Sequence, residues 1–156
     1  GYGEGRTVTF DAMKYIASYG DLIEAYGADT TAATTHYFAT GYGEGRTVTF
    51  DPLAYIASYG DLITAFGTDA ASANAHFIGT GYGEGRTVTF DSSFYLAKYD
   101  DLRAAYGTDQ NLATTHYIVT GFGEERIVNL DGDDTLTGSS FRDNLKGGAV
   151  NVFIFV

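Results

Sequence analysis

Apolar residues recur with helical spacing in a segment that occurs three times along the chain. In its first copy, Met13 and Ile16 are one helical turn apart, which is the spacing of one helix face. Asp11 lies just before this segment, where its carboxylate can accept hydrogen bonds from the free N–H groups of a helix start. In the second copy Pro52 follows Asp51, and proline is favoured at the first helical position. These features predict that a helix begins after each aspartate.

Two more helical segments follow within the same copy. Gly20 interrupts the first segment, and Asp21 can cap a second short helix that ends at Gly27. Asp29 can cap a third segment, TTAATTHYFAT, and Gly41 stands just past its end. The GEGRTVTF stretch alternates polar and apolar residues at its end and is expected to be extended. We therefore expect two helices, the first broken near Gly20, joined by a glycine turn and followed by a short extended strip.

The whole pattern repeats with a period of forty residues. Units 1–40, 41–80 and 81–120 each open with the identical GYGEGRTVTFD and align without gaps. A fourth copy starts as GFGEERIVNLDG, with Glu125 at the place of a glycine, and its helical segment never arrives. Asp100 replaces the glycine of the other units, so this position does not require a positive φ. The chain starts at Gly1, at a point that follows a helix in the later copies, and we expect it to be a fragment, a processed product or an incompletely known sequence.

One unit has more large apolar residues than a forty-residue globule can bury, and stacking on a neighbour solves this problem. The sequence therefore predicts a mainly α fold. We expect a short α-solenoid of three forty-residue helical repeats, plus the start of a fourth, in residues 1–128. A short C-terminal β-rich tail is expected over residues 129–156.

The tail has its own period. Asp134 and Leu136 recur nine residues later as Asp143 and Leu145, which is the period of the calcium-binding nonapeptide of parallel β-rolls. Glycine turns and aspartates there supply oxygen ligands, of which calcium takes about six to eight. Several of the required glycines are replaced, so a weak calcium site and a terminal strand or hairpin that covers the last unit both stay open. The candidate calcium ligands are Asp131, Asp133, Asp134 and Asp143.

Two resemblances add a biological context. The tail resembles the end of RTX-type proteins, which bacteria export by type I secretion and which often finish in a run like NVFIFV. The forty-residue unit resembles helical repeats of large secreted or surface proteins of proteobacteria, with the pattern YxAxxxDL and then HYxxxGxxEGR. Here the pattern spans Tyr15 to Leu22 and His36 to Arg46. The resemblances cover about the last 28 and about 120 residues. They imply a secreted or cell-surface bacterial protein and carry no chemical mechanism.

Charge and composition narrow the range of partners. The formal net charge is -11, with 20 acidic and 9 basic residues, so nucleic-acid phosphates are repelled. The absence of cysteine excludes a disulfide scaffold, a thiolate metal site and a cysteine nucleophile. No apolar run approaches the length of a membrane span. We therefore expect no nucleic-acid partner and no insertion into a membrane.

Each unit carries one histidine and one Glu-x-Arg pair. These residues could form an array of metal or ligand sites, or they could hold the array together, which we favour because a residue repeated in every unit usually does so. No unit has a second histidine at ligand spacing. Glu44 and Arg46 are expected to form an ion pair, and the arginine with nearby tyrosines could also bind a polysaccharide. The candidate interaction residues are His36, His76, His116, Arg46, Arg86 and Arg126.

An enzyme is not expected. Ser18 and Ser58 do not lie on a nucleophile elbow, and the third unit has Lys98 at this position. The first hypothesis is a non-catalytic structural or interaction module that associates head-to-tail with identical copies. The second is a polysaccharide or cell-surface ligand-binding module attached to a secreted enzyme. The third is a calcium-responsive domain that acts through the tail.

Overall fold

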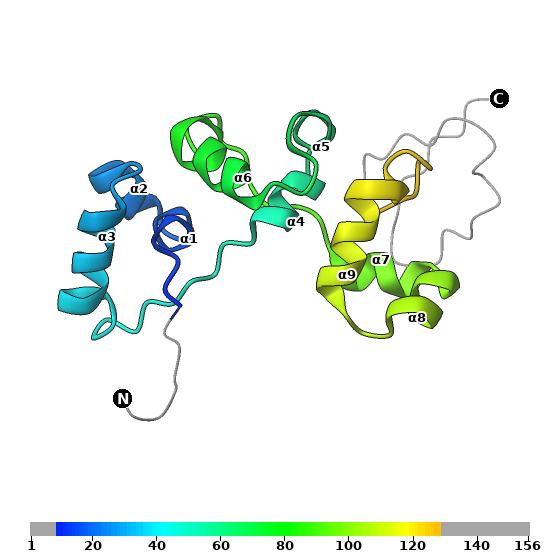
Figure 1. The fold of residues 1–156 in the computed structure, drawn as a ribbon, viewed down its shortest axis with the longest axis horizontal. Coiled ribbons are helices and arrows are strands. Elements are labelled where there is room, and N and C mark those ends of the chain that lie inside the picture. Colours follow the sequence, from blue (N-terminus) through cyan, green and yellow to red (C-terminus); the bar gives the residue numbers. More distant parts are fainter. Residues whose placement is uncertain (1–8, 129–156) are drawn as a thin grey trace, which may run out of the picture.

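The computed structural model describes residues 9–128, which form a row of short helices (Figure 1). The first unit contains α1 (Ala12–Ala17), α2 (Gly20–Tyr26), α3 (Thr30–His36) and the π-helical turn η2 (Tyr37–Gly41). The second contains α4 (Pro52–Ala57), α5 (Gly60–Phe66), α6 (Ala70–His76) and η3 (Phe77–Gly81). The third contains α7 (Ser92–Lys98), α8 (Asp100–Tyr106), α9 (Gln110–His116) and η4 (Tyr117–Gly121). The prediction of a mainly α fold is confirmed, and residues 9–128 contain no strand. The predicted β-rich tail lies outside the described residues.

The first and third helices of each unit start at an aspartate, as predicted. The Asp11 side chain accepts a hydrogen bond from the N–H of Lys14 at 3.0 Å. The Asp29 side chain accepts one from the N–H of Ala32, also at 3.0 Å. In the second unit Pro52 occupies the first helical position. Local sequence therefore decides where these helices begin.

The second helix departs from the prediction. Tyr19 has an extended backbone, with φ -140 and ψ 120, and the helix starts directly after it at Gly20. This extended residue turns the chain between α1 and α2, so a unit has three separate helices. Asp21 lies in the first turn of α2 and does not cap it, which corrects the predicted role of this residue. The helix ends at Gly27, whose φ of 54 is suited to glycine.

The third helix of each unit runs into a π-helical turn and a loop that folds back. In the first unit the Tyr42 N–H donates to the carbonyl oxygen of Tyr37 at 2.8 Å, five residues earlier. The Arg46 N–H donates in the same way to Gly41 at 2.9 Å. Gly45 has a φ of 76, which reverses the direction of the chain. The GYGEGR loop therefore packs on the helices that precede it in the sequence.

These contacts define the folding unit. Arg46 pairs with Asp21, 25 residues earlier, and Arg126 pairs with Asp101 at the same separation. The ring of Phe50 stacks on Phe77 of the second unit, with centroids 4.7 Å apart. The forty-residue period is unchanged, but each unit ends in the linker before the next phenylalanine. The last loop, GFGEER, therefore packs on the third unit and closes it.

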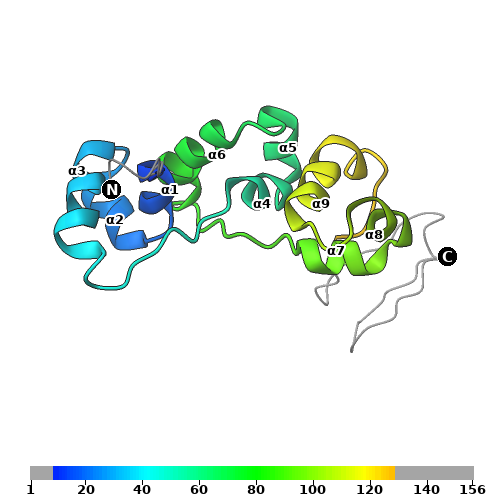
Figure 2. The ribbon, with the colours of Figure 1, turned by 60° about the horizontal axis from the view of Figure 1, so that its bottom comes forward.

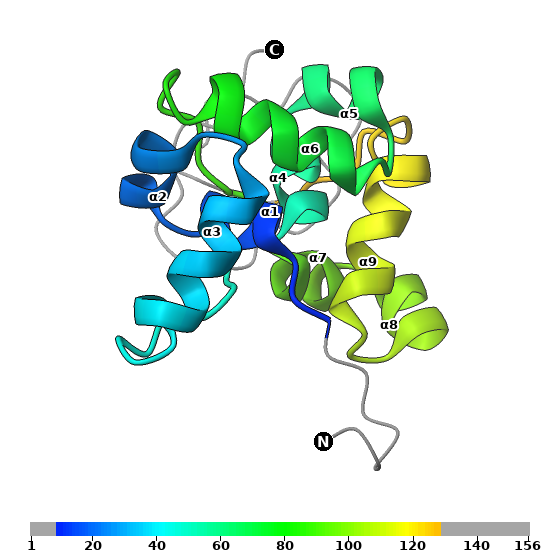
Figure 3. The same ribbon diagram turned by 60° about the vertical axis from the view of Figure 1, so that its left-hand side comes forward.

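Successive units stack through the first helix of one and the third helix of the next. Helix α1 contacts α6 and η3, and α4 contacts α9 and η4, as Figure 2 shows for α1 and α6. Buried apolar residues of all three units form one continuous cluster. The result is an elongated row whose units turn about its long axis (Figures 1 and 3), which is the architecture of a solenoid. Within residues 9–128, no helix has both the length and the apolar content needed to cross a membrane.

The loop of the third unit offers a test of backbone strain. Glu125 has a φ of 56, whereas the equivalent residues Gly45 and Gly85 have a φ of 76. A residue with a Cβ atom loses about 1 kcal/mol in this left-handed region. We expect Glu125→Gly to raise the free energy of unfolding by about 1 kcal/mol, measured by urea denaturation followed by circular dichroism. Gly85→Ala is the matched control and should lower it. Equal stability of the wild type and Glu125→Gly would contradict this account.

Candidate interaction surface

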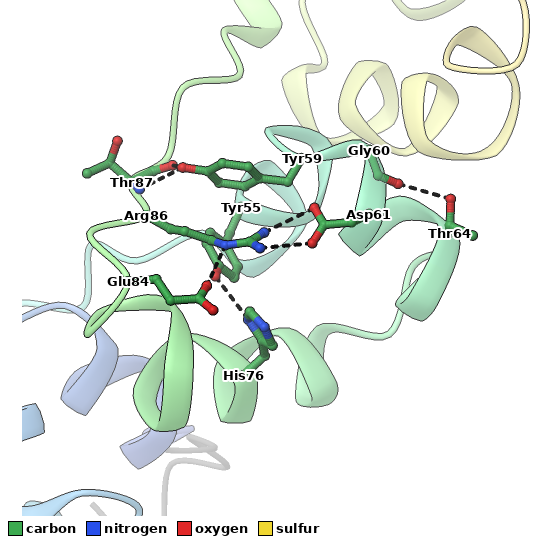
Figure 4. A network of polar contacts seen from close by, with 9 residues as sticks. All are labelled: Tyr55, Tyr59, Gly60, Asp61, Thr64, His76, Glu84, Arg86 and Thr87. Carbon is green, nitrogen blue, oxygen red and sulfur yellow. Dashed lines mark hydrogen bonds and ion pairs between the residues drawn. The ribbon is translucent and has the colours of Figure 1, made fainter.

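A network of polar side chains ties the loop of each unit to its second helix, and Figure 4 shows it for the second unit. Arg86 donates through Nη1 and Nη2 to the two carboxylate oxygens of Asp61 at 3.0 and 2.9 Å, and through Nε to Glu84 at 2.7 Å. Its guanidinium lies over the ring of Tyr59, 4.8 Å from the centroid. The Tyr59 hydroxyl accepts the N–H of Thr87 at 2.9 Å. The same contacts recur around the equivalent arginines of the first and third units.

This network engages every nitrogen of the arginine guanidinium within its own unit. The side-chain hydrogen bonds of Arg86 hold the pKa of the Asp61 carboxyl below its ordinary value, although 60% of that side chain is exposed. The predicted ion pair between Glu44 and Arg46 is confirmed at 2.7 Å. A polysaccharide that used these arginines would have to displace two carboxylates. The aspartate is not among the candidate residues expected from the sequence, although it lies 25 residues before the arginine in every unit.

Each candidate histidine lies at a contact inside its own unit. Nδ1 of His76 and the hydroxyl oxygen of Tyr55 are 3.0 Å apart, which links the third helix to the first. Tyr55 is fully buried, and burial raises its pKa to about 12. The same contact joins His36 to Tyr15 and His116 to Tyr95. In the part of the chain that the structure describes, no three His, Asp or Glu side chains are grouped to hold a metal ion.

The buried tyrosine also explains a repeated glycine. A Cβ atom added at Gly81, the last residue of η3, would overlap the hydroxyl of Tyr55. The same overlap would occur in the other two units. Glycine is therefore needed here because the tyrosine hydroxyl approaches the backbone closely, and not because a helix ends.

Two surfaces meet where successive units stack. We call the surface of Ser18, Gly20 and Ile23 the forward face of the first unit, because Ser18 contacts the linker to the next unit and Gly20 contacts Tyr82 of that unit. We call the back face the surface that meets the preceding unit, formed in the second unit by Ile78 and Tyr82. A Cβ atom added at Gly20 would overlap the hydroxyl of Tyr82. Ile23 lies one turn further along the same helix and is only 8% exposed. An aromatic ring of one unit thus packs on a glycine of the unit before it.

The serine of the forward face holds the linker between units. The Ser18 hydroxyl oxygen accepts the N–H groups of Thr49 and Phe50 at 2.9 and 3.0 Å. Ser58 makes the same pair of bonds with the next linker. Small residues on the forward face therefore serve both the linker and the neighbouring unit.

Within residues 9–128, no other unit covers the back face of the first unit. Phe38 is 67% exposed, whereas its equivalents Ile78 and Ile118 are 8% and 5% exposed. Tyr42 is 74% exposed, about twice the 38% and 39% of its equivalents in the second and third units. The first unit therefore presents an apolar surface of the kind that the other two units bury.

The forward face of the third unit is charged. Lys98, Asp100 and Arg103 occupy the positions that hold serine, glycine and isoleucine in the other units. Asp100 pairs with Arg103, and their side chains are 89% and 47% exposed. Arg103 also donates to the carbonyl oxygen of Leu96 at 3.3 Å. The two ends of the described array therefore have different chemistry.

Comparison with protein families, with curated proteins and with solved structures finds no match for this chain. The resemblances to bacterial repeats and to RTX-type tails stay predictions. The candidate calcium ligands Asp131, Asp133, Asp134 and Asp143 lie outside the described residues, so calcium binding also stays a prediction.

The arginine–aspartate pairs predict how stability depends on pH. Asp21, Asp61 and Asp101 have folded-state pKa values lowered by their arginines. They therefore stabilise the fold above the unfolded pKa of about 3.9, and this contribution is lost as pH falls through the lower folded value. Replacing all three by asparagine should lower the stability at pH 7 and flatten its fall between about pH 4 and pH 2. Urea denaturation at a series of pH values measures both effects. Glu125→Gln is the control, and an unaltered acid slope in the triple variant would argue against the pairs.

The glycine of the forward face tests the stacking contact. In Gly60→Asp the new Cβ would lie about 3.0 Å from Cζ of Phe122 and would bring a charge into that contact. We expect a loss of about 1–3 kcal/mol in unfolding free energy. The reverse change in the third unit, Asp100→Gly, is the matched control and should alter stability by less than about 1 kcal/mol. Denaturation by urea compares the two, and equal effects would contradict the stacking contact.

Proposed function

We propose that this chain is a non-catalytic structural and interaction module of an exported or surface bacterial protein, which extends by stacking units of one kind. The observation that supports this proposal is which contacts are made by the side chains common to the three units. Those that could serve chemistry, such as Arg86, His76 and Tyr55, are bonded inside their own unit. Those that line the unit surface, such as Gly60 and Ser58, contact the next unit or its linker. The exported context rests on the sequence resemblance alone.

The proposal also explains why the same side-chain contacts occur in all three units. An active site needs a few groups in one asymmetric arrangement, whereas here each arrangement occurs three times with nearly the same distances. Repetition instead suits a continuous core in which every unit covers its neighbour. Length and stability then follow from the number of units, and no single unit carries a separate activity.

Removing one unit tests this proposal. Deletion of residues 51–90 joins Phe50 to Asp91, so the forward face of the first unit meets the back face of the third, with Ile118 and Phe122. We expect a folded protein whose helical signal is that of two units in place of three. It should also be shorter and less stable than the wild type. Circular dichroism, urea denaturation and small-angle X-ray scattering measure these three properties.

The control removes a piece that is not a folding unit. Deletion of residues 51–76 takes away α4, α5 and α6 but leaves the loop that closes them. We expect this variant to lose helical signal and cooperative unfolding. The proposal fails if deletion of residues 51–90 unfolds the protein, or if the two deletions behave alike.

A further inference from the structure

We propose that the back face of the first unit is a docking site for the forward face of another unit of this kind. We further propose that the charged forward face of the third unit prevents copies of this chain from filling that site. Both statements rest on the stacking function proposed above. The occupant is defined by its chemistry: a unit with serine, glycine and isoleucine at the positions of Ser18, Gly20 and Ile23.

The back face of the first unit corresponds to surfaces that are buried in the two interfaces inside the chain. The back faces of the second and third units are each covered by a forward face of this composition. Ile78 and Ile118 are buried there, whereas Phe38 is 67% exposed at the same position. Asn74 and Thr114 are 5% and 3% exposed, while the equivalent Thr34 is half-buried. The first unit thus lacks the cover that its equivalents have, and the fold itself supplies the shape of that cover.

The forward face of the third unit has a different chemistry from the forward faces inside the chain. Asp100 stands where a glycine receives the aromatic ring of the next unit, so a ring packed there would meet a Cβ atom and desolvate a carboxylate. Lys98 replaces the serine that accepts the linker N–H groups. Arg103 replaces an isoleucine that is 8% exposed in the first two units. Each change replaces a contact of the internal interfaces with a charge.

The charges that the helices of the third unit gain lie together on this forward face. Relative to the helices of the second unit, α7, α8 and α9 gain charged side chains at three positions, and these are Lys98, Asp100 and Arg103. Tyr95 and Leu102, which are buried inside the unit, keep their apolar character. The two ends of the array therefore differ: the back face of the first unit can bind a further unit, whereas the forward face of the third unit excludes one.

The experiment restores the internal sequence at the blocked end of the full chain. In the variant Lys98→Ser, Asp100→Gly, Arg103→Ile, every new residue already occurs at the same position in the first two units. We expect the wild type to be a monomer at about 100 μM and the triple variant to form head-to-tail oligomers that grow with concentration, because the contact is heterologous and does not close. Light scattering after size-exclusion chromatography measures the mass, and circular dichroism confirms that each variant is folded.

Two further variants with Phe38→Glu test whether the association uses the back face of the first unit. Adding Phe38→Glu to the triple variant blocks its back face, and this quadruple variant should be a monomer. Mixed with the wild type, which has an open back face, the quadruple variant should form a one-to-one complex. Phe38→Glu alone changes an exposed side chain and should stay a folded monomer.

Three results would overturn the proposal: a triple variant that stays monomeric, association that survives Phe38→Glu, or a wild type that associates through Phe38. Failure here is separate from failure of the stacking function. If deletion of residues 51–90 leaves a folded array while the triple variant stays monomeric, units stack only within one chain. If the deletion itself unfolds the protein, the stacking function is wrong and the docking site loses its basis.

Discussion

Every α-helix in residues 9–128 has six or seven residues, which is too short to persist in water on its own hydrogen bonds. Packing must therefore hold the helices together, and each unit does this in two places. The buried tyrosine, exemplified by Tyr55, reaches from the first helix to the histidine of the third. The arginine of the loop, such as Arg86, clamps the second helix through its aspartate. A unit without its closing loop has lost one of these two ties, so the loop belongs to the unit before it.

Packing between units depends on small residues as much as on large ones. The aromatic ring of Tyr82 reaches the backbone of α2 only because Gly20 has no side chain. Ser18 is short enough to accept two linker N–H groups at the edge of the same face. These contacts place one unit on the next at a fixed angle, and the gradual turn of the row follows from their repetition (Figure 3). A larger or charged residue at these positions would therefore disturb the contact between units, while the hydrogen bonds of the arginine and the histidine inside each unit would remain.

Features that act over a few residues could be predicted from the sequence. The aspartate caps, the proline at the first helical position and the pair of Glu44 with Arg46 all depend on near neighbours. Contacts between residues that are 21 or 25 positions apart could not, because their partners depend on how the helices fold together. Gly20 illustrates the difference. Asp100 at the same position correctly indicated that a positive φ is not needed. The packing of an aromatic ring, which does need a glycine, became visible only in the structure.

A repeat array with equivalent interfaces has no intrinsic end. A contact between a forward face and a back face is heterologous, so identical units would continue to add until something stops them. The charges gained by the helices of the third unit relative to the second lie at Lys98, Asp100 and Arg103, at the positions that hold serine, glycine and isoleucine on the forward face of the other units. A polar outer face is what a terminal repeat needs to remain in contact with water. Within residues 9–128, the third unit therefore has the charged outer face that suits a terminal repeat, whereas the first unit exposes the aromatic side chains of Phe38 and Tyr42.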